Sequence, residues 1–161
     1  MNLTIKQAVE TDVPQILALM REFAEYENLL EHFEATEERL HAALFGAGRV
    51  AEACLAFNGE RAIGYAVFYP NFSTFRGQRG FYLEDIFITR AARGRGAGEE
   101  LLRHIARRGR ERGFERIDFQ VLEWNAPAIE FYESLGARRD ETERHFKFTD
   151  DAFRALAATD R

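Results

Sequence analysis

The sequence is poor in the residues that build disulfides, metal sites and linkers. Its 161 residues include one cysteine, Cys54, and 3 prolines, which excludes an internal disulfide and a cysteine-built metal site. No apolar run approaches the roughly 18 residues that a membrane span needs, and the start MNLTIKQAVETD lacks the features of a signal peptide. We therefore expect a cytoplasmic protein with one domain over residues 1–161, with no metal and no membrane partner.

The composition that remains is typical of a soluble globular protein, with 46% apolar and 30% charged residues. The charge is unevenly distributed, because residues 10–41 carry nine acidic residues against two arginines, whereas residues 90–116 carry nine arginines against four acidic residues. The first region favours a cationic ligand and the second an anionic one, although on charge alone two solvated helix faces explain both. A pI near 5.5 argues against a nucleic-acid partner.

Hydrophobic periodicity and turn residues predict alternating strands and helices. Strands are expected around Leu3 and Ile5, at 50–57, 61–69, 81–89 and 116–122, and once or twice within 137–149. Helices are expected after caps at Thr11 or Asp12, at Thr36 and at Asn125, and from about Gly96 to Arg112, while residues 70–80 are expected to form a loop. This order predicts an α/β (α+β) fold in which a mixed sheet is covered by helices.

The stretch TRAARGRGAGEELL, residues 89–102, leads from an apolar strand into a helix through a glycine-rich turn. Such a turn presents unpaired backbone N–H groups at the positive end of a helix dipole, and this arrangement binds phosphate. A nucleotide P-loop is excluded because no lysine follows the turn. A dinucleotide fingerprint is excluded because Glu99 stands where the last glycine is needed. The residues therefore favour a pyrophosphate-bearing cofactor of another kind.

The segment RGRGAG at 93–98 resembles the [QR]-x-x-G-x-[GA] coenzyme A loop of the GNAT N-acetyltransferases. Three further segments, REFAEYE at 21–27, YLEDIFI at 82–88 and VLEWNAPAIEFYESLGA at 121–137, are similar to the diamine acetyltransferase branch of that superfamily. This branch includes the spermidine/spermine and thialysine acetyltransferases. The resemblance implies a single-domain GNAT fold with a largely antiparallel sheet, acetyl-CoA as cosubstrate and a homodimer.

The resemblance also implies which residues bind the cosubstrate. The backbone of the loop would bind the pyrophosphate, through Arg93, Gly94, Arg95, Gly96, Ala97 and Gly98. The strand backbone at Ile86, Phe87 and Ile88 would pair with the pantetheine arm. Asn125 would lie near that arm, and a plain helix cap explains Asn125 equally well.

Acetyl transfer to an amine needs a group that removes a proton and a group that protonates the departing thiolate. An aliphatic amine has a pKa of about 10.4 and arrives as a cation, so a carboxylate can both attract it and accept its proton. Glu84 holds this position in the family pattern, and alternation along the strand predicts that Asp85 points to the opposite face. Tyr132 reads as a core aromatic from periodicity alone, whereas the resemblance implies that it is the proton donor to the thiolate.

The acceptor is expected to be a small cationic amine that is acetylated by direct attack in a ternary complex. Tyr26 and Glu27 match acceptor-site positions of the branch, and Asp85 is a further candidate there. Ser73-Thr74-Phe75 replaces the Asp-Pro-Trp of the polyamine enzymes, which favours thialysine or a lysine-like amino acid over a polyamine. Thr142-Glu143 stands where relatives carry Gly-Trp. A peptide or protein N-terminal acetyltransferase and a catalytically silent coenzyme A-binding regulator remain as alternatives.

Overall fold

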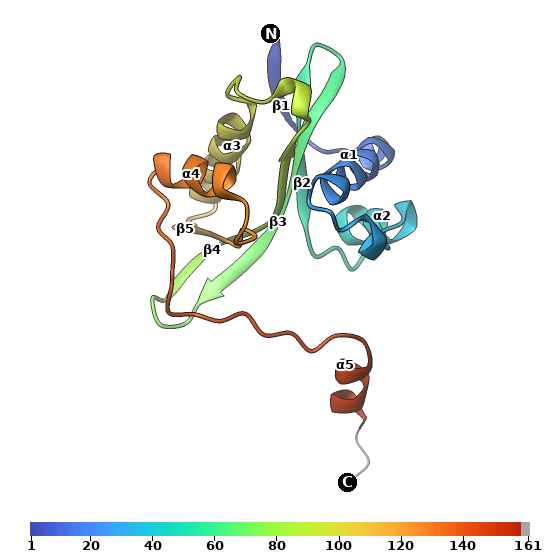
Figure 1. Ribbon diagram of the computed structural model, residues 1–161, viewed down its shortest axis with the longest axis vertical. Helices are drawn as coiled ribbons and strands as arrows, with labels where there is room; N and C mark the ends of the chain where they lie inside the picture. Colours follow the sequence, from blue (N-terminus) through green and yellow to red (C-terminus); the bar gives the residue numbers. More distant parts are fainter. Residues whose placement is uncertain (159–161) are drawn as a thin grey trace. The chain divides into compact units, whose positions relative to one another are not determined.

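A computed structural model describes residues 1–158 of the chain (Figure 1). These residues form two compact units, of which the first is Met1–Gln120 and the second begins at Val121. None of the helices within the described range combines the length and the apolar character that a transbilayer segment requires.

The first unit is built on a sheet whose five described strands lie in chain order. They are β1 (Leu3–Gln7), β2 (Glu52–Asn58), β3 (Arg61–Ser73), β4 (Gln78–Ile88) and β5 (Arg116–Phe119). All neighbours are antiparallel except β4 and β5, which are parallel. The predicted mixed, largely antiparallel sheet is confirmed.

The hairpin of β3 and β4 is longer than predicted. The expected loop at 70–80 is wrong, because both strands continue until Ser73 pairs with Gln78. The residues of this stretch include Pro70 and two glycines, which favour a loop in the sequence. The pairing of the two strands nevertheless supplies hydrogen-bond partners for their backbone N–H and C=O groups. Residues 74–77 form the turn. The motif Ser73-Thr74-Phe75 therefore lies at a hairpin tip, where Phe75 is fully exposed.

Helices cover both faces of the sheet (Figure 1). One face packs against α1 (Val13–Tyr26) and α2 (Glu37–Phe45), whose buried residues join a core with Leu55, Tyr65 and Phe87. The other packs against α3 (Ala97–Glu111), which contributes Leu101 and Ile105 to a core with Phe68 and Phe81. Short 3-10 turns precede or follow these helices, at η1 (Glu10–Asp12), η2 (Leu30–His32) and η3 (Arg90–Ala92). Cys54 is fully buried, and burial raises its thiol pKa to about 12, so it is an inert core cysteine.

The second unit contains α4 (Ala126–Ser134) and α5 (Asp150–Ala157). The predicted cap of α4 is confirmed, because the side-chain oxygen of Asn125 accepts a hydrogen bond from the Ala128 amide at 3.4 Å. The strands expected within 137–149 are wrong, because none of these described residues joins the sheet. Phe146 and Phe148 alternate with polar residues as in a strand, but a strand also needs a paired neighbour.

A partly exposed ion-pair network joins the start of β2 to α3. Glu52 accepts hydrogen bonds from Arg108 Nε at 2.6 Å and from both terminal nitrogens of Arg112, at 2.7 and 2.8 Å. Burial acts to raise the pKa of Glu52, but the hydrogen bonds and charges of Arg112 and Arg108 outweigh it and hold the pKa below its ordinary value. The ionised carboxylate therefore stabilises the fold.

Replacing Glu52 by Gln is expected to lower the free energy of unfolding by about 0.5–1.5 kcal/mol at neutral pH, because two arginines lose their charged partner in a network that solvent partly screens. The folded-state pKa is lowered, so this contribution is present above the ordinary pKa of glutamate and is lost as the pH falls through the lowered value. Urea unfolding of the two proteins over a pH series measures it. Equal stabilities at pH 7, or a difference that does not narrow on acidification, contradict this account.

Candidate active site

A β-bulge in β4 shapes the carboxylate pair that the sequence singles out. Val67 of β3 pairs with Asp85, whereas the next residue, Phe68, pairs with Leu83, so Glu84 is the extra residue. The two residues of such a bulge direct their side chains to the same side of the sheet. The expectation that Glu84 and Asp85 point to opposite faces is therefore wrong, because it assumed regular alternation.

Two tyrosines of β3 hold these carboxylates. The Tyr65 hydroxyl donates to Asp85 Oδ2 at 2.9 Å, and the Tyr69 hydroxyl donates to Glu84 Oε2 at 3.3 Å. Tyr65 and Tyr69 are four residues apart on one strand, so they share a face, and this is the face that packs against α1. Sequence reasoning missed both tyrosines, although hydroxyl-bearing residues at alternate positions of an apolar strand are a usable signal.

The carboxylates form an electrostatically coupled group. Burial raises the pKa of Asp85 to about 6, the Tyr65 hydrogen bond opposes this rise, and the negative charge of Glu84 adds to it. Burial, followed by the charge of Asp85, also raises the pKa of Glu27. Burial and the nearby Asp85 raise the pKa of Tyr65 well above its ordinary value, so this hydroxyl stays protonated as a donor. The group attracts a cation and can take a proton near neutral pH.

The end of α1 brings aromatic residues to the same place. Phe87 of β4 stacks on Phe23 with ring centroids 5.1 Å apart and lies 6.3 Å from Tyr26. The guanidinium carbon of Arg93 is 4.2 Å from the centre of the Tyr26 ring. The structure therefore gathers Tyr26 and Glu27, which the sequence assigns to the acceptor, with the β4 residues around Asp85.

The pairing of β4 with β5 ends at the bulge, because β5 ends at Phe119. Their pairing runs from Gly80 opposite Arg116 to Leu83 opposite Phe119, whereas β4 continues to Ile88. The Thr89 amide donates to the Ile63 carbonyl on the β3 side. Because successive backbone groups alternate in direction, the groups of Phe87 face β3 and those of Ile86 and Ile88 face the other edge. An extended ligand can add to this second edge as another strand does.

The loop that follows β4 fits a pyrophosphate. Gly94 and Gly96 adopt φ values of +73° and +83°, in the left-handed region that favours glycine. Gly96 is the N-terminal cap of α3, whose 15 residues begin at Ala97. The first amides of a helix have no partner within it and point toward its N-terminus, so the amides of this loop converge where an anion binds. Arg95 is exposed on the same loop, and Gly98 lies in the first turn of the helix.

The two predicted site residues beyond residue 120 belong to the second unit. Asn125 caps α4, and Tyr132 lies within α4, with its ring centroid 5.2 Å from that of Phe131. The Thr142 amide and hydroxyl both donate to Asp140 Oδ1, at 2.9 and 2.6 Å. The assignment of Tyr132 as proton donor and of Asn125 as a pantetheine neighbour stays a prediction.

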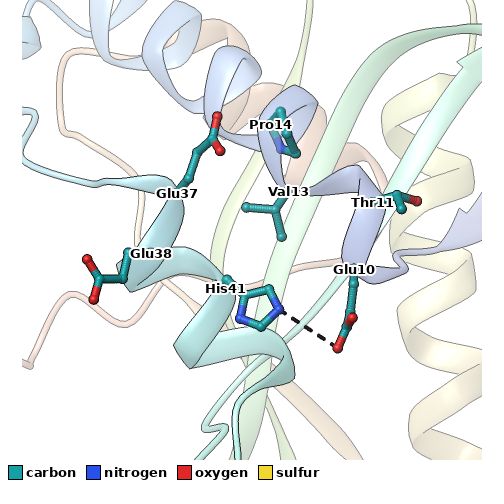
Figure 2. Close-up of a pocket in the computed structure, with 7 residues that line it drawn as sticks. All are labelled: Glu10, Thr11, Val13, Pro14, Glu37, Glu38 and His41. Atoms are coloured by element: carbon teal, nitrogen blue, oxygen red, sulfur yellow. Dashed lines mark ion pairs between the residues drawn. The ribbon is translucent and has the colours of Figure 1, made fainter.

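The pocket in Figure 2 lies elsewhere in the first unit. It has a volume of about 450 Å³ and lies between the start of α1 and α2, lined by Glu10, Thr11, Val13, Pro14, Glu37, Glu38 and His41. His41 Nε2 is 3.8 Å from Glu10 Oε1. None of the predicted site residues lines it. Within residues 1–158, no group of three or more His, Cys, Asp or Glu side chains is arranged to hold a metal ion.

Comparison with known proteins identifies the family of this chain. A model of the acetyltransferase (GNAT) family matches residues 14–137. The chain belongs to the GNAT acetyltransferase family. The resemblance read from the loop and the three accompanying segments is thereby confirmed, and the protein is an acyltransferase.

Two relatives of this acetyltransferase are named for the basic amino acids that they acetylate. It is 35% identical over 165 residues to thialysine N-epsilon-acetyltransferase of Bos taurus, covering 95% of this chain and 96% of the relative. It is 29% identical over 198 residues to L-ornithine N5-acetyltransferase NATA1 of Arabidopsis thaliana, covering 94% and 86%. An integron cassette protein from the mobile metagenome of V. cholerae shares the fold, with a TM-score of 0.82 at 23% identity and 99% of both chains covered.

Proposed function

We propose that this chain is an acetyl-CoA-dependent N-acetyltransferase whose acceptor is the primary amine of a small cation, either a lysine-like amino acid such as thialysine or a polyamine. The observation that carries the proposal is the β4 bulge, which turns Glu84 and Asp85 to the face shared with Tyr65 and the end of α1. A group of carboxylates beside aromatic rings suits an alkylammonium ion. The names of the thialysine and ornithine acetyltransferases support the same class of acceptor.

The cosubstrate supplies an acetyl group activated as a thioester. We assign its pyrophosphate to the backbone amides from Arg93 to Gly98 and its pantetheine arm to the edge of β4 that faces away from β3, at Ile86 and Ile88. Phe87 contributes its ring to the acceptor side. The positive φ of Gly94 and Gly96 supports this assignment, because it lets a ligand approach the backbone closely. Asn125 remains our candidate neighbour of the arm.

The residues divide the chemistry among them. Glu84, with Asp85 beside it, attracts the ammonium ion and accepts its proton through a water molecule. The neutral amine attacks the acetyl carbonyl, and the Ile86 amide meets the developing charge on the oxygen. The new N–C bond forms, the C–S bond breaks, and Tyr132 donates its proton to the departing thiolate. The attacking nitrogen loses its extra proton to solvent, and solvent returns a proton to Tyr132. We propose direct transfer in a ternary complex, so no acyl-enzyme forms.

The test is release of free coenzyme A thiol from acetyl-CoA across an amine panel. The panel holds thialysine, lysine, ornithine, spermidine, short diamines and a peptide that begins with alanine. Turnover with the small amines and little with the peptide is the expected result. Preference for the peptide identifies an N-terminal acetyltransferase instead. Binding of acetyl-CoA without turnover of any amine leaves a silent coenzyme A-binding regulator.

We also propose that residues 1–161 act as one N-acetyltransferase domain, in the cytoplasm and as a homodimer. Several large apolar side chains of the second unit are exposed, which suits a protein interface: Phe146, Phe148, Phe153 and Leu156. Light scattering of the purified chain is expected to give twice the 18.6 kDa mass of one chain. The mass of a single chain at micromolar concentration contradicts the homodimer.

A further inference from the structure

Arg93 is the first residue of the proposed pyrophosphate loop, yet its side chain lies on the acceptor side. Its Nε donates to the Ile88 carbonyl at 3.0 Å. Its guanidinium carbon lies 4.2 Å from the centre of the Tyr26 ring and 5.4 Å from that of Phe87. One hydrogen bond and two cation–π contacts hold the guanidinium over the aromatic end of α1 and β4.

The Arg93 guanidinium has no carboxylate partner in the described part of the chain. The ion pairs within residues 1–158 include Arg103, Arg107, Arg108 and Arg112 but not Arg93, and Arg93 is exposed. The Nε atom binds the protein, so the two terminal nitrogens remain for a ligand. A guanidinium in this state binds carboxylates through two parallel hydrogen bonds.

The charged side chains around the site therefore suit an acceptor that carries both a positive and a negative charge. Glu27, Glu84 and Asp85 supply negative charge for an ammonium ion, and Arg93 supplies a positive charge on the rings of Tyr26 and Phe87. Ile86, our candidate for the reacting end, and Ile88, which holds Arg93, are two residues apart, a span of about 7 Å along a strand. The extended side chain of a basic amino acid separates its terminal amine from its carboxylate by a similar length.

We propose that Arg93 binds the carboxylate of the acceptor, so that the enzyme selects basic amino acids over the corresponding diamines. The inference rests on the proposed function and adds a specificity-determining residue to it. A diamine satisfies the carboxylates of the site equally well, but it places a second cation or a bare methylene group beside the guanidinium. A basic amino acid places its terminal ammonium ion at the carboxylates of the site and its own carboxylate at the guanidinium.

Matched acceptors that differ by one carboxylate test the proposal. Lysine is compared with cadaverine, and ornithine with putrescine, by kcat/KM for wild-type enzyme and for Arg93→Gln, Arg93→Lys and Arg95→Gln. Arg95 is the control, because it is an exposed arginine of the same loop. Thermal melting of each variant checks that it folds, and the wild-type comparison of acceptors needs no variant at all.

Wild-type enzyme is expected to favour lysine over cadaverine by about 10- to 100-fold, the contribution of a charge-assisted hydrogen-bonded pair. Arg93→Gln should abolish that preference by lowering kcat/KM for lysine alone. Arg93→Lys should restore it only in part, because lysine lacks the planar fork. Arg95→Gln should retain the full preference.

Two results overturn the inference while leaving the proposed function standing. One is a wild-type enzyme that is active but indifferent to the acceptor carboxylate. The other is an Arg93→Gln enzyme in which lysine and cadaverine are impaired equally and the KM for acetyl-CoA rises as in Arg95→Gln, which assigns Arg93 to the phosphates. Absence of turnover in the wild type with every amine overturns the proposed function as well.

Discussion

Replacing Tyr132 by Phe is expected to lower kcat by about 100- to 10,000-fold, the usual contribution of a positioned general acid. This substitution removes only the hydroxyl group, and the departing thiolate then has to take its proton from solvent. Steady-state release of coenzyme A thiol, with lysine-like acceptors at saturating concentration, measures the effect. The KM for acetyl-CoA should change little, because the ring remains in α4.

Phe131→Leu is the matched control for Tyr132→Phe. Phe131 is the neighbour in α4 whose ring lies 5.2 Å from that of Tyr132, so its replacement disturbs the helix without removing a hydroxyl. We expect a small loss of kcat in this variant. A Tyr132→Phe enzyme that retains most of its activity, or a Phe131→Leu enzyme that loses as much, contradicts the role of Tyr132 as the acid.

Replacing Asp85 by Asn is expected to lower kcat/KM for the amine by about 10- to 100-fold, because a charge-assisted contact to the ammonium ion is lost. The thermal stability of the folded protein should not fall. Burial raises the pKa of Asp85 to about 6, so the folded state disfavours the ionised carboxylate at pH 7, and a neutral amide there is expected to preserve or raise the melting temperature. A lower melting temperature together with the lower kcat/KM indicates a structural role for Asp85 instead.

The same carboxylate predicts the acid side of the pH profile. The kcat/KM for the amine should fall as the pH drops through about 6, because protonation of Asp85 removes a negative charge beside the proposed acceptor. The Tyr65 hydrogen bond lowers the Asp85 pKa, so Tyr65→Phe should shift the fall of kcat/KM on the acid side to higher pH. A fall that stays in place or moves to lower pH contradicts the assignment.

The elements with strong local signals could be predicted from the sequence. Thr36 caps α2 through its hydroxyl, which accepts from the Arg39 amide at 3.2 Å, and Gly59 with φ +62° closes the β2–β3 hairpin. These signals depend on a few neighbouring residues. The glycine loop is of the same kind, because glycine permits the positive φ that Gly94 and Gly96 adopt.

The geometry of the candidate site depends on contacts between distant residues, and the sequence does not contain it locally. The bulge at Glu84 arises from the register of β3 against β4, and alternation along β4 alone predicts opposite faces for Glu84 and Asp85. Tyr65 reads as a core aromatic until its hydroxyl is found on Asp85. Arg93 reads as a phosphate ligand until its side chain is found over Tyr26.

The central claim is direct acetyl transfer to a small amine, and a product balance tests it most directly. Purified enzyme is incubated with acetyl-CoA, with and without a lysine-like amino acid, and both free thiol and N-acetylated amine are quantified by mass spectrometry. The account predicts thiol release only when the amine is present, with an equal amount of N-acetylated amine. Thiol release without amine, or none with any amine despite tight binding of acetyl-CoA, contradicts it.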